Sequence, residues 1–401
     1  MRRPSTPGFI GDKLREAREA RGLNGTALAD LTDISRQSIS KYEIGDQSPS
    51  PETLERISKV LKVPIDYFLT PRKRTLDLKS AIFYRSMSTK TLTERLRAEK
   101  RFIWLQDIVA YLMSMVDFPK VNLPDFNIPE NPELITDTLI EDTALELRQY
   151  WGLGLGPISN MVWLLENNGI IVSSYSLETA TLDAFSQHHF DRPYVVIGTD
   201  KHSAARARFT AGHELGHLVL HKHLSQKDIR TPKTLKLIEA QANRFSGAFH
   251  LPERSFSEDF LQVDLDYFRV KKSRWKLSIA FFVERAKNLG YVDESRYKLL
   301  RRYISRKGWT KVEPLDEEIE VEKPQLLKDS FELIIQNNVC TRSEILQKLK
   351  LNPDDIESVC GLPSRYLSPA EVIKLPQRKS AKLKRDIEQP GEVIDLFGKK
   401  A

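Results

Sequence analysis

The stretch RFTAGHELGHLVLH, residues 208–221, contains the motif His-Glu-x-x-His at His213–His217 and is the most informative part of the chain. Apolar residues recur across 204–220, and this pattern predicts one long helix. Residues four apart on a helix lie on one face, about 40° from each other. Both imidazoles can therefore reach one metal ion, and Glu214 lies beside them, where its carboxylate can act on a water molecule.

A catalytic zinc site also needs a third protein ligand and an open position for water. Glu239 begins the next strongly helical stretch, EAQANRF (239–245), 22 residues after His217. That separation allows a turn and an antiparallel return to the first helix, and a longer helix is predicted over 235–249. The alternative is a pair of surface histidines on an ordinary helix, and the carboxylate of Glu239 argues against it.

Amide hydrolysis is the chemistry that such a site predicts. Zinc polarises the scissile carbonyl and lowers the pKa of a bound water toward about 7. Glu214 then takes the proton from that water as general base and passes it to the leaving amine. The sequence does not identify the group that stabilises the oxyanion. Three nearby histidines could help, but we expect them to be solvated or to support the ligands: His221, His223 and His250.

The surrounding sequence resembles the ImmA/IrrE family of metallopeptidases, over roughly residues 140–310. The matching stretches are IEDTALELRQYWGLG (140–154), LLENNGIIV (164–172), TLDAFS (181–186), RFTAGHELGHLVLH (208–221) and EAQANRFSGAFHLP (239–252). The resemblance implies a zincin-like domain in which His213, His217 and Glu239 hold one zinc ion, or another divalent metal such as Mn²⁺, with Glu214 catalytic. One departure is Gln241, which stands where many members have an acidic residue. Members of this family typically cleave or inactivate a helix-turn-helix repressor, in mobile-element control or stress responses.

The N-terminal residues 8–70 have the pattern of five short helices. Polar residues suited to N-caps precede three of them, namely Asn24, Ser35 and Ser50, and Pro51 suits a first helical position. The predicted helices are 11–20, 26–31, 35–42, one that begins at 51, and a short one within 63–69.

This N-terminal region resembles the Cro/λ-repressor type of helix-turn-helix, also called XRE. The matching stretches are LREAREARGLN (14–24), SRQSISKYEIGDQSPSPETLERISKVL (35–61) and VPIDYFL (63–69). A recognition helix presents polar residues to base edges while its other face packs, so Ile39 and Tyr42 are expected to point inward. The exposed candidates are Arg36, Gln37, Ser38, Ser40 and Lys41.

Within this set, Arg36 suits guanine and Gln37 suits adenine, whereas Asn24, Thr26 and Lys41 suit phosphates, which orient without specifying sequence. Double-stranded DNA is therefore the predicted partner, and a homodimer is a further expectation because such domains usually bind two half-sites. The alternative is a helical bundle kept for protein contacts only. The predicted helix 90–117 is a candidate dimer surface, although core packing is the more common role of an apolar helix.

Composition and charge agree with this division. The first 100 residues carry 20 Lys and Arg against 13 Asp and Glu, an excess equal to the net charge of +7 of the whole 401-residue chain. A basic N-terminal quarter favours an anionic partner there, although a solvated basic surface is the alternative. No stretch approaches the 18 apolar residues of a membrane span, and the two cysteines, Cys340 and Cys360, suit a reducing compartment. We therefore expect a cytoplasmic protein without a membrane partner.

The expected fold class is mainly α with a small β-sheet (α+β). Four regions are predicted: a DNA-binding domain (8–70), a linker and helical connector (71–135), a metallopeptidase domain (136–310) and a helical C-terminal region with a disordered tail (311–401). Further helices are expected at 140–150 and 158–167, two within 275–307 and short ones across 324–368. Strands are expected at 169–172 and 194–197. The proline-containing segment 118–135 is expected to be an exposed connection.

The resulting function hypothesis is a zinc-dependent endopeptidase with a sequence-specific DNA-binding domain, acting on a transcriptional repressor. A second hypothesis is a transcriptional regulator in which the peptidase fold is a sensor with little cleavage. A third is an interaction protein such as an antitoxin, whose partner the sequence does not reveal. The helical region after 311, including Phe331–Leu349, is a further candidate for selecting the substrate or partner.

Overall fold

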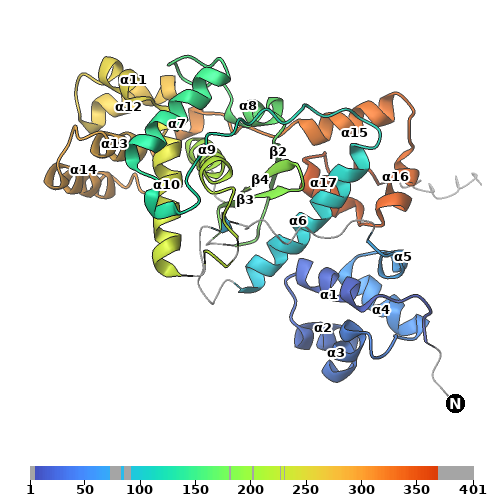
Figure 1. The fold of residues 1–401 in the computed structure, drawn as a ribbon. Helices are drawn as coiled ribbons and strands as arrows, with labels where there is room; N and C mark the ends of the chain where they lie inside the picture. Colours follow the sequence, from blue (N-terminus) through green and yellow to red (C-terminus); the bar gives the residue numbers. More distant parts are fainter. Residues whose placement is uncertain are drawn as a thin grey trace, which may run out of the picture. The chain divides into compact units, whose positions relative to one another are not determined.

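The computed structural model (Figure 1) describes residues 5–72, 83–84, 92–179, 182–200, 203–225, 227–229 and 231–368. Within these ranges the chain is mainly helical with one small sheet, so the predicted fold class is confirmed. No helix in the described part is both long and apolar enough to cross a membrane. The predicted disordered tail, the last 30 residues, lies outside the described residues.

Five helices form the N-terminal domain: α1 (Gly11–Ala20), α2 (Gly25–Thr32), α3 (Arg36–Ile44), α4 (Pro51–Leu61) and α5 (Ile65–Leu69). The three predicted caps are confirmed, since the side chains of Asn24, Ser35 and Ser50 accept hydrogen bonds from the first turns of α2, α3 and α4. Each cap satisfies a backbone N–H that a helix N-terminus otherwise leaves unpaired. Ile39 of α3 is buried in the core of this domain and Tyr42 is half-buried against it, as expected.

Helix α6 (Leu92–Leu112) lies within the predicted helix 90–117 and is a core element. It packs against α1 and against the C-terminal helices. Its Trp104 donates to the hydroxyl of Tyr67, and its Phe102 meets Phe185 of the sheet edge-to-face. Of the expected linker 71–80 only Pro71 and Arg72 are described, and Arg72 is ion-paired with Glu16 and Asp107. Because the apolar residues of α6, including Phe102 and Trp104, are buried within the chain, core packing is favoured over a dimer surface for this helix.

The central part contains α7 (Asp137–Tyr150), α8 (Met161–Asn167), β2 (Ile171–Tyr175), β3 (Ala184–His189), β4 (Arg192–Gly198), α9 (Ala204–Leu220) and α10 (Pro232–His250). The sheet has the order β1-β3-β4-β2, where β1 is Phe83–Tyr84. β3 and β4 form an antiparallel hairpin, β2 is parallel to β4, and β1 is antiparallel to β3. Strand β3 was absent from the sequence prediction, because its polar residues, including Ser186 and Gln187, do not have the apolar pattern of a buried strand.

The prediction that segment 118–135 is an exposed connection holds only in part, because the segment is irregular but some of its residues are buried. Phe118, Ile128 and Ile135 are at most 8% exposed, and Ile128 and Ile135 belong to the core cluster that holds α7, α9 and α10. Prolines prevent a regular helix, but they do not make a segment polar. The apolar residues of this segment therefore pack into the core from an irregular backbone.

The remaining helices are α11 (Glu253–Asp259), α12 (Leu265–Trp275), α13 (Ile279–Asn288), α14 (Glu294–Arg306), α15 (Leu326–Gln336), α16 (Arg342–Leu349) and α17 (Pro353–Cys360). The two helices predicted within 275–307 and the short helices of 324–368 are confirmed, whereas α11 and α12 were not predicted. α17 packs on β2, where Ser173 donates a hydrogen bond to the carbonyl of Val359. Cys360 is buried and Cys340 is half-buried, and both are free thiols.

Candidate metal centre

Helix α9 places the His-Glu-x-x-His motif in the interior of the protein. The helix has the predicted bounds, and Ser203 caps its first turn. His213, Glu214 and His217 are each 1% exposed. Surface histidines, the alternative considered from the sequence, are therefore excluded for this motif.

Two glycines let α10 pack closely on α9. A Cβ at Gly216 would lie 3.2 Å from Ala242 Cα of α10, and one at Gly212 would lie 2.7 Å from the Ser246 hydroxyl. Because neither position has a Cβ, the two helix backbones approach closely, which brings Glu239 over the motif. Glu239 does not begin this helix, as the sequence suggested, because α10 starts earlier at Pro232 behind the cap Thr231.

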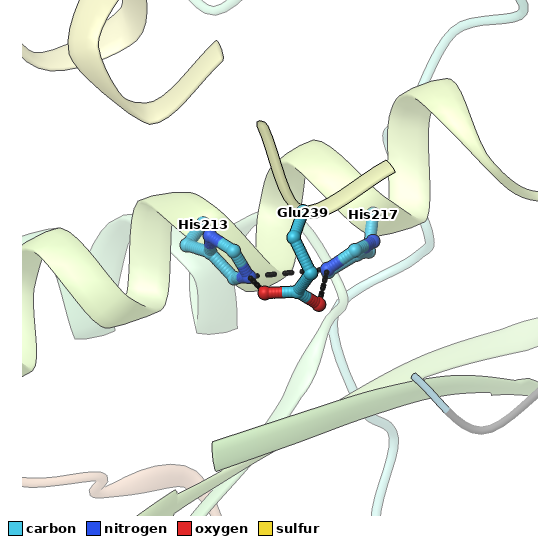
Figure 2. Close-up of side chains that lie close together, drawn as sticks. All are labelled: His213, His217 and Glu239. Atoms are coloured by element: carbon cyan, nitrogen blue, oxygen red, sulfur yellow. Dashed lines mark hydrogen bonds and ion pairs between the residues drawn. The ribbon is translucent and has the colours of Figure 1, made fainter. Parts of the chain in front are cut away.

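The three predicted ligands converge (Figure 2). Glu239 Oε2 lies 3.4 Å from His213 Nε2, and Glu239 Oε1 lies 3.3 Å from His217 Nε2. The two Nε2 atoms are 3.1 Å apart. These residues form the one group in the described part of the chain whose ligand atoms all lie within 4.8 Å of one another and could hold a metal ion.

Hydrogen-bonding contacts at Nδ1 orient the two ligand rings on the side away from Glu239. His213 Nδ1 lies 2.9 Å from the amide oxygen of Asn243, which sits one turn after Glu239 on α10. An amide oxygen only accepts, so Nδ1 of His213 carries the proton and its Nε2 presents a lone pair toward Glu239. Sequence reasoning missed Asn243, although its spacing of four from Glu239 places both residues on one face of a helix.

His217 contacts His221 on its far side. Their Nδ1 atoms are 3.0 Å apart, and His221 Nε2 lies 3.0 Å from the side-chain oxygen of Gln241. The expectation that nearby histidines support the ligands holds for His221. By contrast His250 contacts the carbonyl of Arg208 through Nε2, and His223 is exposed.

Glu214 points to the sheet side of α9. Ser186 of β3 donates a hydrogen bond of 2.6 Å to Glu214 Oε2. A buried carboxylate held in this way has a defined orientation, which a general base requires. Ser186 is the last residue of the quoted stretch TLDAFS, but only the tertiary structure reveals that it contacts Glu214.

Burial and charge act in opposite directions on the acidic ligand. Burial alone would raise the pKa of Glu239, but the facing rings of His213 and His217 lower this pKa well below its usual range. Burial lowers the pKa of His221 well below that of a free histidine, and it lowers the pKa of His250 to about 3. The rings thus favour the ionised form of Glu239, and burial favours the neutral form of His221.

This donor set fits a divalent metal ion. Two imidazole nitrogens and one carboxylate are the protein ligands of one common class of catalytic zinc site. Lewis bases that face one another at 3.1–3.4 Å repel unless a proton or a cation lies between them. A divalent cation satisfies all three donors together.

The predicted DNA contacts lie on α2 and α3. Arg36, Gln37 and Ser40 are exposed on α3, whereas Lys41 is half-buried. Ser38 is also half-buried, and it hydrogen-bonds to the cap Ser35 through both its backbone and its hydroxyl. On α2, Thr26 is exposed, and the oxygen of Asn24 accepts from the backbone of Ala27. Asn24 thus has a capping role in addition to its predicted phosphate contact.

Comparison with known families agrees with this two-part organisation. The helix-turn-helix family matches residues 14–68, and the IrrE N-terminal-like domain, a peptidase M78 family, matches residues 165–287. The chain belongs to the XRE-type helix-turn-helix family and carries behind that domain an ImmA/IrrE-like domain with a metallopeptidase-type fold.

Similar curated proteins are named as transcriptional regulators. The SPbeta prophage-derived regulator YonR of Bacillus subtilis is 35% identical over 70 residues, which are 18% of this chain and 65% of the relative. A transcriptional regulator in the ATPase CF(0) region of Rhodospirillum rubrum is 40% identical over 65 residues, which are 16% of this chain and 60% of the relative. The cryptic phage CTXphi transcriptional repressor RstR of Vibrio cholerae is 35% identical over 76 residues, 18% of this chain and 68% of that repressor. The chain thus spans about two thirds or less of the length of these relatives.

Proposed function

We propose that this protein is a zinc-dependent endopeptidase that binds double-stranded DNA through its N-terminal domain and cleaves a helix-turn-helix transcriptional repressor. The observation that carries the proposal is the convergence of His213, His217 and Glu239 beside the buried carboxylate of Glu214. Zinc is the metal that this donor set favours, and Mn²⁺ is an alternative occupant.

The residues of the site supply the steps of amide hydrolysis. A bound zinc ion would polarise the scissile carbonyl and acidify a water molecule. Glu214 takes the proton of the attacking water and delivers it to the leaving amine. Ser186 holds the Glu214 carboxylate through its 2.6 Å hydrogen bond, which keeps the base in one orientation between the two transfers.

The N-terminal domain supports the DNA-binding part of the proposal. Arg36, Gln37 and Ser40 are exposed along α3 for base contacts, and Ser38 and Lys41 lie beside them. Thr26 and Asn24, at the start of α2, would contact phosphates. Two copies of the chain would bind the two half-sites of an operator as a homodimer.

A second candidate function is transcriptional regulation or antitoxin activity in which the peptidase fold senses a signal or binds a partner with little cleavage. It is favoured by the names of the similar proteins, which are regulators and a repressor.

Incubation of the zinc-loaded full chain with purified helix-turn-helix repressors would separate the two functions. Intact-mass spectrometry detects cleavage, and the Glu214→Gln variant is the matched control because glutamine still accepts from Ser186. The proposal expects fragments with the parent chain and none with the variant. Zinc binding without any cleavage would favour the sensor, and equal fragments from both chains would indicate a contaminating protease.

A further inference from the structure

A chain of hydrogen bonds connects the ligand His217 to a distant stretch of backbone. Gln241 Nε2 donates to the carbonyls of Pro132 and Ile135, at 2.7 and 3.1 Å. Gln241 Oε1 lies 3.0 Å from His221 Nε2, and His221 Nδ1 lies 3.0 Å from His217 Nδ1. Gln241 is 4% exposed, and the two rings are each 1% exposed.

The two backbone carbonyls determine which way the amide of Gln241 faces. Carbonyl oxygens accept and never donate, so the NH₂ group must face Pro132 and Ile135. The amide oxygen must then face His221, where it accepts a proton that Nε2 of this ring carries.

The same reasoning passes through His221 to the metal ligand. His221 is 1% exposed, and burial disfavours a ring that carries protons on both nitrogens, so its Nδ1 is an acceptor. One of the two facing Nδ1 atoms must donate, and only His217 can. His217 Nε2 is thereby left with a lone pair directed at Glu239.

We propose that Gln241 is a positioning residue for the metal centre, which acts through His221 to hold His217 in the tautomer that binds metal. The inference rests on the proposed metal site and extends it, because it identifies what selects the ligand form of His217. His213 obtains the same tautomer from Asn243. In each case an uncharged amide oxygen orients the ligand ring. Asn243 contacts His213 directly, whereas Gln241 acts on His217 through the ring of His221.

Two variants at one position separate this role from ordinary packing. Gln241→Met has a similar volume but no acceptor, so His221 loses the partner of its Nε2–H in the metal-binding tautomer. Gln241→Glu keeps an oxygen for His221 and loses the NH₂ group that anchors the side chain to Pro132 and Ile135. Both variants lose the anchoring bonds, and only the first loses the acceptor.

The first measurement is zinc affinity of the full chain by competition with a chromophoric chelator. We expect Gln241→Met to bind zinc about 10–100-fold more weakly, the usual effect of removing a partner of a metal-bound histidine. Gln241→Glu should stay within about threefold of the parent, although both variants lower thermal stability. Equal affinity of Gln241→Met and the parent, or equal losses in both variants, would overturn the inference.

The second measurement needs no metal. Long-range ¹H–¹⁵N spectra of the histidine-labelled, metal-free chain distinguish the two ring tautomers, and the chain has only eight histidines. We expect the proton of His221 on Nε2 in the parent, where Gln241 accepts it, and on Nδ1 in Gln241→Met. A parent His221 ring protonated on Nδ1 would refute the inference even if the Met variant failed to fold. A parent chain that bound no zinc would contradict the proposed function, and the tautomer of His221 would still show whether Gln241 selects it.

Discussion

Replacing Gly216 with alanine should weaken the metal site and lower the free energy of unfolding by no more than about 2 kcal/mol. The added Cβ would lie 3.2 Å from Ala242 Cα, from Ala242 O and from Phe245 Cβ. Neither backbone nor Cβ atoms can rotate away, so α10 must move from α9 by a few tenths of an ångström. Glu239 lies three residues before Ala242 on the same helix and moves with it.

Two opposing effects determine the stability of this variant. Alanine in place of glycine inside a helix gains about 1 kcal/mol, and overpacking of a well-packed core costs about 1–3 kcal/mol. The free energy of unfolding should therefore fall by about 0–2 kcal/mol. Metal sites tolerate ligand shifts of only about 0.2 Å, so the displaced Glu239 should weaken zinc binding on the order of tenfold, which is about 1.4 kcal/mol.

A second glycine on the same pair of helices provides the control. A Cβ at Gly247 of α10 would meet only the Arg285 side chain, at 3.6 Å and beyond, which is ordinary contact. Gly247→Ala should therefore raise stability by up to about 1 kcal/mol and leave zinc affinity unchanged. Urea denaturation of the metal-free chains and chelator competition measure the two quantities. Zinc affinities that are equal in the two variants would refute the argument that helix spacing positions Glu239.

Three further predictions concern other parts of the chain. Glu214→Gln should retain one zinc ion by metal analysis and lower the cleavage rate by at least about 10²-fold, and unchanged proteolysis would remove Glu214 from its role. Arg36→Ala should weaken operator binding by about 1–3 kcal/mol in a titration and leave zinc content unchanged, whereas unaltered affinity would contradict the placement of Arg36 at a base. Burial raises the pKa of Glu166 to about 7, although its carboxylate accepts from the backbone N–H groups of Gln325 and Leu326. Because this folded-state pKa exceeds the unfolded value, the stabilising contribution of Glu166 is complete below about pH 4.5 and is lost as the pH rises through 7, by up to about 3 kcal/mol. Glu166→Gln should remove that loss from a series of urea denaturations between pH 5 and 8, and identical pH profiles would count against it.

The sequence predicted well those features that depend on residues close together in the chain. Helix α1 has the predicted bounds, and α2 to α4 begin at the expected caps. His213 and His217 share a face because any helix places residues four apart in this way. These predictions succeed because caps and periodicity act within one or two turns.

Several features of the candidate site could not be predicted in this way. The choice of Glu239 among the acidic residues rested on a family resemblance, and no local pattern links it to His213. The contact of Ser186 with Glu214 joins a strand that the sequence did not indicate to the helix of the motif. The segment 118–135 looked like a surface connection, yet two of its carbonyls hold Gln241.

The sequence by itself determined the helices, their caps, the two imidazoles on one face and the division into a helix-turn-helix domain and a peptidase-like domain. Only the tertiary structure decided which carboxylate meets those imidazoles, how Glu214 is held, and which side chains contact His217 from its far side. The physical reason is the range of the interactions. Helix periodicity and capping depend on neighbours in sequence, whereas the Gln241 contacts join residues more than 100 positions apart, which only the packing of α10 against the rest of the chain brings together.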